Sequence, residues 1–256
     1  MKPARQILKS MIEKGQHEID RETNGLFLSS FSAGLDIGFG PLLMGVILTL
    51  SVGSYGDLVT ELLLASAYSV GFIFVILGRS ELFTEHTSLA VMPVIDGKSS
   101  LKQLARLWGI VYAGNILGGL IFTGLAVMLM PGLGVISTEA FGTIANKLVS
   151  HQLHWLFIAG IFAGWLMGLL AWLVSSAENT IGRVFFIWMV TATIGVLHLP
   201  HSIAGNVEVL FGLFTTSSVT IIDYLGFLSL ATLGNAFGGA FFVGIMKYSH
   251  VIRGAK

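Results

Sequence analysis

Long uninterrupted apolar runs constrain this chain more than any other feature of its sequence. Four of them, centred on residues 27–50, 104–130, 152–174 and 222–247, exceed the length of about 20 residues that a helix needs to cross roughly 30 Å of hydrocarbon. Charged residues make up only 11% of the chain and hydrophobic residues 54%, whereas soluble domains carry about 25% charged residues. The sequence therefore predicts an all-helical membrane protein whose surroundings are a lipid bilayer.

Two further apolar stretches, 61–94 and 183–214, are too long to be simple spans. As unbroken helices they would extend about 50 Å at 1.5 Å per residue, which exceeds the hydrocarbon thickness. Each has polar or helix-breaking residues near its middle: Arg79, Glu81, Glu85 and His86 in the first, and His198, Pro200, His201, Gly205 and Asn206 in the second. We therefore predict six transmembrane helices, with the second and fifth interrupted near 82–86 and 200–206.

A segment of the third predicted span returns in the sixth. GNILGGLIF at 114–122 reappears as GNAFGGAFF at 234–242, and six positions match at an offset of 120 residues: Gly114/Gly234, Asn115/Asn235, Gly118/Gly238, Gly119/Gly239, Phe122/Phe242 and Gly124/Gly244. Each copy, about 26–130 and 150–248, holds three spans, so the second copy enters the membrane from the opposite side. Such inverted repeats are common in transport proteins, which form substrate sites near the midplane from interrupted helices.

At the same offset Glu81 falls opposite His201 and Thr84 falls opposite Ala204. The two interruptions are therefore expected to meet at one central locus. Small residues spaced three and four apart let helices approach closely, so we interpret the repeated glycines as packing residues. The two repeated asparagines could bond either a neighbouring helix or the broken backbone.

Lysine and arginine, which favour the cytoplasmic side of a membrane, are unevenly distributed. Five of the 14 precede residue 25 and three lie at 96–106, whereas the loops on the opposite side hold only Lys147. We therefore expect both termini in the cytoplasm, with three loops outside: 51–60, 131–150 and 215–221.

This topology divides the chain into three parts. Residues 1–25 are predicted to be a cytoplasmic segment with a short helix at the membrane surface, because lysines alternate there with four apolar residues: Ile7, Leu8, Met11 and Ile12. The six-span domain then covers 26–250, and 251–256 form a cytoplasmic tail.

Two motifs resemble the formate/nitrite transporter family. GRSELFT at 78–84 is similar to the family's G-x-x-LFT loop in the broken second span, and HSIAGN at 201–206 is similar to its H-S-x-A-N in the broken fifth. The resemblance covers nearly the whole chain after residue 25. It implies a homopentamer in a bacterial inner membrane, with aquaporin-like protomers that each hold a pore for small monovalent anions or their protonated acids, such as formate, nitrite and hydrosulfide. It implies no cofactor, no metal, no nucleic-acid partner and no enzymatic activity.

The resemblance also assigns residues to the pore. His201 would be the central histidine, Thr84 the hydroxyl that faces it, and Leu82 and Phe83 the loop residues at one apolar constriction. Spacing along the same helices adds three further constriction candidates: Phe72, Tyr68 and Ile194. Polar candidates for the pore or its vestibules are Glu81, Glu85, His86, Asp36, His198 and Asn206. As supports of the first interruption, Glu81 and Arg79 could pair either with each other or with backbone amides of the loop.

The chain departs from the family pattern at three places. Pro200 precedes His201 where many members have an acidic residue, and only Lys147 lies near the position of a family lysine. Glu85 and His86 follow the LFT motif where small or neutral residues are usual. This pattern is similar to the branch represented by the inner-membrane YfdC proteins.

The leading hypothesis is a channel or secondary transporter for a small monovalent anion or its protonated weak acid. His201, between two apolar constrictions, would donate a hydrogen bond or exchange a proton near neutral pH, so that flux rises as the outside is acidified.

Two alternatives stay open. A channel for a cation or small neutral solute could use the intramembrane acids, which include Asp36, Glu81, Glu85 and Glu208. An intramembrane metalloenzyme could let His198 and His201 share a metal with His86 or Glu85, although no HExxH signature or nucleophile–base set is present.

Overall fold

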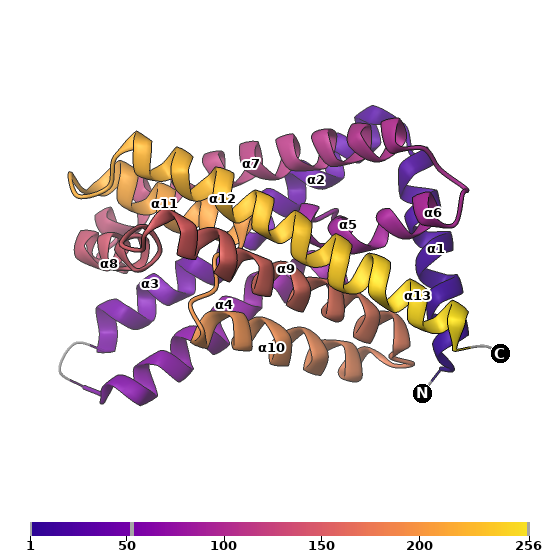
Figure 1. The fold of residues 1–256 in the computed structure, drawn as a ribbon. Coiled ribbons are helices and arrows are strands. Elements are labelled where there is room, and N and C mark those ends of the chain that lie inside the picture. Colours follow the sequence, from indigo (N-terminus) through magenta and orange to yellow (C-terminus); the bar gives the residue numbers. More distant parts are fainter. Residues whose placement is uncertain (1, 52–53, 255–256) are drawn as a thin grey trace.

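A computed structural model describes residues 2–51 and 54–254 (Figure 1). Of the predicted segments, residue 1, residues 52 and 53 of the first outer loop, and residues 255 and 256 of the tail lie outside this description. In the described ranges all regular structure is helical, in the order α1 (Ala4–Asp20), α2 (Thr23–Ile37), α3 (Phe39–Ser51), α4 (Asp57–Gly78), α5 (Phe83–Leu89), α6 (Val91–Ile95), α7 (Leu101–Gly132), α8 (Thr138–Val149), α9 (Leu153–Ser176), α10 (Thr180–Val196), α11 (Ser202–Thr215), α12 (Ile221–Gly238), the π-helix η1 (Gly239–Ile245) and α13 (Met246–Arg253).

Five helical segments of the described chain are long and apolar enough to cross a membrane. They are Thr23–Ser51, Asp57–Gly78, Leu101–Gly132, Leu153–Ser176 and Ile221–Arg253. Two shorter apolar helices, α10 and α11, make up most of the stretch 183–214. The protein is thus an all-helical integral membrane protein. Its long apolar helices run roughly along one direction, α1 lies across them at the end that holds both termini, and α8 lies at the other end (Figure 1).

Both predicted interruptions exist, but each begins a few residues earlier than the sequence suggested. The first runs from Arg79 to Leu82, where Arg79 ends α4 in the left-handed conformation with φ 59°. The second runs from Leu197 to His201 and includes His198 with φ 48°. The predicted ranges 82–86 and 200–206 are mostly helical, because their polar residues cap or begin the following half-helix instead of breaking the preceding one.

Glycines let the long helices pack in two similar pairs, α2 against α7 and α9 against α12. A β-carbon at Gly34 of α2 would collide with the backbone of Asn115 in α7, and one at Gly164 of α9 would collide with the backbone of Asn235 in α12. The packing interpretation of the repeated glycines is therefore correct for Gly118, whose β-carbon would collide with the backbone of α2.

Helix α1 packs its apolar face against the protein. Ile7, Leu8, Met11 and Ile12 are at most 5% exposed and form one cluster with residues of α5, α6, α9 and the C-terminal helix. This face was expected to lie on lipid; because protein already covers it, the helix does not need a membrane surface to bury its apolar residues.

Candidate functional site

The two half-helices that follow the interruptions bring His201 and Thr84 together. His201 is the N-cap of α11 and Thr84 lies in the first turn of α5. Their side chains share a hydrogen bond of 2.7 Å between Nε2 of the histidine and Oγ1 of the threonine. Both residues are buried, at 1% and 0% exposed. The structure thus brings together the histidine and hydroxyl that the motifs singled out.

Capping fixes the chemistry of the His201 ring. Nδ1 accepts hydrogen bonds from the backbone N–H groups of Ile203 (3.3 Å) and Ala204 (3.1 Å), which have no partner inside the helix. A ring nitrogen that accepts carries no hydrogen, so the neutral ring has its hydrogen on Nε2 and donates it to Thr84. His201 is therefore placed as a hydrogen-bond donor, and a second proton on Nδ1 would displace both amides.

Apolar rings continue from His201 toward the end of the bundle where α8 lies. Phe72 contacts the imidazole edge to face at a centroid distance of 5.0 Å, and Tyr68 contacts Phe72 at 5.1 Å. Ile194 of α10 is also buried, at 1% exposed. Phe72 and Tyr68 therefore lie on one side of the imidazole, and Tyr68 and Ile194 line the cavity that adjoins them.

The loop residues of the first motif have different surroundings. Leu82 is fully buried and is the N-cap of α5. The ring of Phe83 contacts Trp108 and Tyr112 of α7, at centroid distances of 5.9 and 5.1 Å. Phe83 thus anchors the start of α5 to α7. Leu82 and His201 are the N-caps of the two half-helices that follow the interruptions. Equivalent residues of the two interruptions are therefore 119 positions apart in the sequence. The expected match of Glu81 with His201, which assumed 120 positions, is wrong by one residue.

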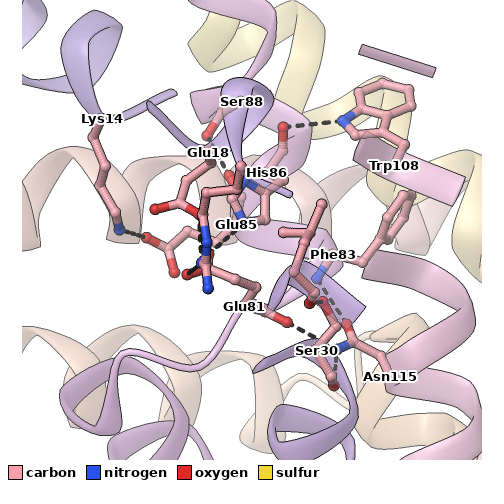
Figure 2. A network of polar contacts seen from close by, with 12 residues as sticks. Lys14, Glu18, Ser30, Glu81, Phe83, Glu85, His86, Ser88, Trp108 and Asn115 are labelled. Atoms are coloured by element: carbon pink, nitrogen blue, oxygen red, sulfur yellow. Dashed lines mark hydrogen bonds and ion pairs between the residues drawn. The ribbon is translucent and has the colours of Figure 1, made fainter. Parts of the chain in front are cut away.

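Two repeated asparagines hold the interruptions in the same way. Asn115 donates to the carbonyls of Ser30 and Glu81 (2.7 and 2.8 Å) and accepts from the backbone N–H of Phe83 (2.8 Å) (Figure 2). Each asparagine therefore bonds both a neighbouring helix and the broken backbone, which the sequence left as alternatives.

Asn235 makes the equivalent contacts in the second half of the chain. It donates to the carbonyls of Gly160 and Pro200, both at 2.9 Å, and accepts from the backbone N–H of Ser202 at 2.8 Å. Because the first N–H groups of a helix and the carbonyl before it lack helical partners, this side chain satisfies groups that would otherwise be orphaned inside the protein.

Acidic residues around the first interruption are paired with bases, several of them from the N-terminal segment. Glu81 bonds Arg21 (2.8 Å) and His86 (2.7 Å), and Glu85 bonds Lys14 (2.7 Å). Figure 2 shows Lys14 of α1 reaching Glu85 in the first turn of α5. A Glu81–Arg79 pair, one of the two alternatives, is absent among the described residues; Arg79 is exposed. Lys14 and Arg21 were not singled out from the sequence, since no local spacing links them to an acid 60 to 71 residues away.

The Lys14–Glu85 pair has an electrostatic consequence for the lysine. The carboxylate of Glu85 raises the pKa of Lys14 above its ordinary value of 10.5, against the opposing effect of burial. Lys14 therefore stays positively charged at physiological pH and keeps Glu85 neutralised.

Two cavities lie at opposite ends of the His201–Thr84 pair. The inner one, near the chain termini, has a volume of about 510 Å³ and is lined by residues that include Lys14, Arg21, Arg79, Glu81, Glu85 and Arg183. The outer one, near α8, is lined by residues that include Glu61, Tyr68, Lys147, Ile194, His198 and Glu208. A buried donor thus stands between two openings of the helical bundle.

Each of the remaining polar candidates has a hydrogen-bond or ion-pair partner. Asp36 accepts from Ser32 and Ser80 at 3.3 and 3.4 Å, so it supports the first interruption. His198 is 3.3 Å from Glu61, which also bonds Lys147. These contacts place His198 in the wall of the outer cavity.

Asn206 lies deeper in the bundle and accepts from the Tyr224 hydroxyl at 2.7 Å. His86, by contrast, is held by Glu81 on the inner side. No three His, Asp or Glu residues of the described chain form a cluster that could hold a metal, and the residues that a metalloenzyme would need are bound to separate partners.

Known proteins are similar to this chain in sequence and in fold. The family model described as "Formate/nitrite transporter" matches residues 5–249. The "Inner membrane protein YfdC" of Escherichia coli (strain K12) is 31% identical over 245 residues, which are 93% of this chain and 76% of that protein. The "Formate channel FocA" of Haemophilus influenzae is 26% identical over 244 residues, 86% of this chain and 84% of that protein. A solved structure, "Pentameric formate channel with formate bound", has a TM-score of 0.76 at 24% identity and covers 90% of this chain and 98% of that chain, which shows the same fold.

Proposed function

The chain belongs to the formate/nitrite transporter family, and we propose on this premise that it is a membrane channel or secondary transporter for a small monovalent anion or its protonated weak acid. Formate, nitrite and hydrosulfide define the substrate class. The observation that carries the proposal is the buried hydrogen bond from Nε2 of His201 to Thr84, between an inner and an outer cavity. A fixed N–H donor in an apolar passage suits an anion or a carbonyl-like oxygen.

Each residue of the passage has a distinct part in the proposed mechanism. A substrate oxygen takes the place of the Thr84 hydroxyl as acceptor of the Nε2 hydrogen, and the freed Thr84 hydroxyl can donate to the same substrate. Phe72 and Tyr68 form the apolar constriction on the outer side. Burying a charge in such a constriction is far more costly than burying a neutral acid, so the substrate crosses it as the protonated acid.

We extend the proposal to six spans in two inverted three-helix repeats, about 26–130 and 150–248. The second span is then α4 with α5, and the fifth is α10 with α11. Support comes from the five long apolar segments and from the equivalent bonds that Asn115 and Asn235 make across the interruptions.

The same proposal includes the assembly and its orientation. The likeness to a pentameric formate channel supports a homopentamer. The common end of the two termini and the excess of Lys and Arg on that side support a cytoplasmic location for both termini. The inner-membrane relative supports the inner membrane as the location.

Flux measurements in proteoliposomes test the proposed function. Formate, nitrite, hydrosulfide and acetate are offered with and without an inward proton gradient, beside simple cations, and empty liposomes serve as the control. We expect uptake of at least one of the weak acids and no cation flux. A reversal potential in asymmetric salt that follows the cation would favour the cation channel and contradict the proposal. The pairing of Glu81 with Arg21 and of Glu85 with Lys14 favours the anion, because paired acids present little net negative charge to a cation.

A further inference from the structure

Glu208 is a buried carboxyl group without a partner. It is 7% exposed, and across residues 2–51 and 54–254 it has neither a hydrogen bond nor an ion pair. The other acids near the two interruptions are all held: Asp36 by serines, Glu61 by Lys147 and His198, Glu81 by Arg21 and His86, and Glu85 by Lys14. None of the pairs already described uses Glu208.

The helix places Glu208 in line with the central histidine. Glu208 lies seven residues after His201 along α11, which corresponds to about 10 Å along the axis and to the same helix face. The side chain between them on that face is the methyl group of Ala204. Glu208 lines the outer cavity together with Tyr68, and Tyr68 contacts Phe72, which contacts the imidazole. The carboxyl group is therefore at the outer side of the apolar constriction.

A carboxylate anion must gain a proton on the outer side of the apolar constriction before it can cross as a neutral acid. His201 is not arranged to supply that proton. Its Nδ1 caps α11 and its Nε2 hydrogen is the fixed donor. Gaining a proton on Nδ1 would break the helix cap, and losing the proton on Nε2 would remove the donor that contacts the substrate. Burial without a partner penalises the charged form of a carboxyl group. A carboxyl of that kind is suited to gain and lose a proton rather than to hold a fixed charge.

We propose that Glu208 transfers the proton to the transported carboxylate in the outer cavity. This inference rests on the proposed function and names the group that makes the substrate neutral. The O–H bond of the Glu208 carboxyl breaks, its electron pair stays on the glutamate oxygen, and an O–H bond forms on the substrate. The neutral acid passes Phe72, and the outer solution returns a proton to Glu208, so each cycle moves a proton together with a carboxylate anion.

Charged and titratable groups from three neighbouring segments face Glu208 in the cavity. They are Glu61 and Tyr68 of α4, Lys147 of α8 and His198 after α10. Lys147 supplies positive charge for the carboxylate that remains after the transfer. His198 is the rival proton carrier, because it is partly exposed at the same cavity and its imidazole can take up and release a proton.

The test measures formate uptake and the accompanying internal acidification in proteoliposomes, with the outside varied from neutral to acidic pH. Glu208→Gln keeps the size and hydrogen-bonding capacity of the side chain but removes the exchangeable proton. We expect it to lower uptake at acidic pH by about tenfold or more, in the range of a lost general acid, and to abolish both the rise with acidification and the coupled proton entry. Glu208→Asp should restore the pH profile, and Glu139→Gln, on the exposed side of α8, should match the unsubstituted protein.

Several results would overturn the inference. One is a normal pH profile of uptake in Glu208→Gln. Another is a lower uptake rate in both Glu208→Gln and Glu208→Asp with an unchanged pH profile, which would indicate a structural role. His198→Gln that abolishes the pH response while Glu208→Gln keeps it would assign the proton to the histidine. If the unsubstituted protein moves formate and Glu208→Gln behaves normally, only this inference fails; if the unsubstituted protein moves no weak acid, the proposed function fails and takes this inference with it.

Discussion

Replacing Asn235 by leucine should destabilise the protein by removing the support of the second interruption. The side chain satisfies the N–H of Ser202, which begins α11, and the carbonyl of Pro200 in the interruption. Its third partner, the carbonyl of Gly160, lies inside α9. Leucine has a similar size but neither donor nor acceptor, so two buried backbone groups lose their partner.

The magnitude follows from these two groups. An unsatisfied buried donor or acceptor costs about 1–3 kcal/mol, which gives a total of about 2–6 kcal/mol. Side-chain hydrogen bonds in membrane proteins average only about 0.6 kcal/mol and reach about 1.7 kcal/mol, since the unfolded chain in a membrane also finds partners. We therefore expect Asn235→Leu to lose about 2–4 kcal/mol of unfolding free energy.

Denaturant unfolding of the purified protein in mixed micelles, followed by circular dichroism, measures this loss. Asn115→Leu should lose a similar amount, because Asn115 makes the equivalent bonds at the first interruption. The matched control is Asn206→Leu, which removes a single bond from the Tyr224 hydroxyl and should lose about 1 kcal/mol. A loss for Asn235→Leu no larger than that of the control would refute the argument that these asparagines hold the broken backbone.

Three further predictions concern the pore, the charge pairs and the topology. His201→Asn should fold, because asparagine is a good N-cap, but its shorter side chain withdraws the donor from Thr84, so weak-acid flux should fall by about tenfold or more; a normal flux would contradict the donor role. A double-mutant cycle of Lys14→Gln and Glu85→Gln should give a coupling energy of about 1 kcal/mol, measured as unfolding free energy. Since Glu85 raises the pKa of Lys14 above 10.5, this coupling should be present at neutral pH and disappear as the pH rises through the raised value, and a coupling absent at neutral pH would contradict the pair. Asp57→Cys should react only with reagent added outside, and labelling from the cytoplasmic side alone would reverse the proposed topology.

Hydropathy and length were sufficient to predict most of the helical plan. The apolar runs predicted the long helices, and the excessive length of 61–94 and 183–214 predicted that both would be interrupted. The positions of the interruptions were wrong by a few residues, because polar residues at a helix start satisfy its free N–H groups. His201 caps α11 in this way and ends the second interruption, whereas the sequence suggested that the interruption continued to Asn206.

The repeat was visible, but its register across the interruptions was not. The asparagines are 120 residues apart, whereas the caps Leu82 and His201 are 119 apart. One cap is a leucine without a side-chain hydrogen bond and the other is a histidine that accepts two. Residues that occupy the same place in the backbone but differ in chemistry give no sequence signal, so their equivalence is visible only in the folded structure.

The partners of the acids decide how their charge is interpreted. In the sequence, Glu81 and Glu85 suggest attraction of a cation to the pore. In the structure each carboxylate bonds a base from the N-terminal segment, and such long-range pairs have no periodic signature. In the proposed mechanism, once these acids are neutralised, the group directed at the passage is the Nε2 hydrogen of His201, which bonds Thr84 in the structure. A donor of that kind can bind an anion, whereas the apolar ring of Phe72 beside it favours a neutral species. A weak acid fits both groups if its anion gains a proton before it reaches Phe72.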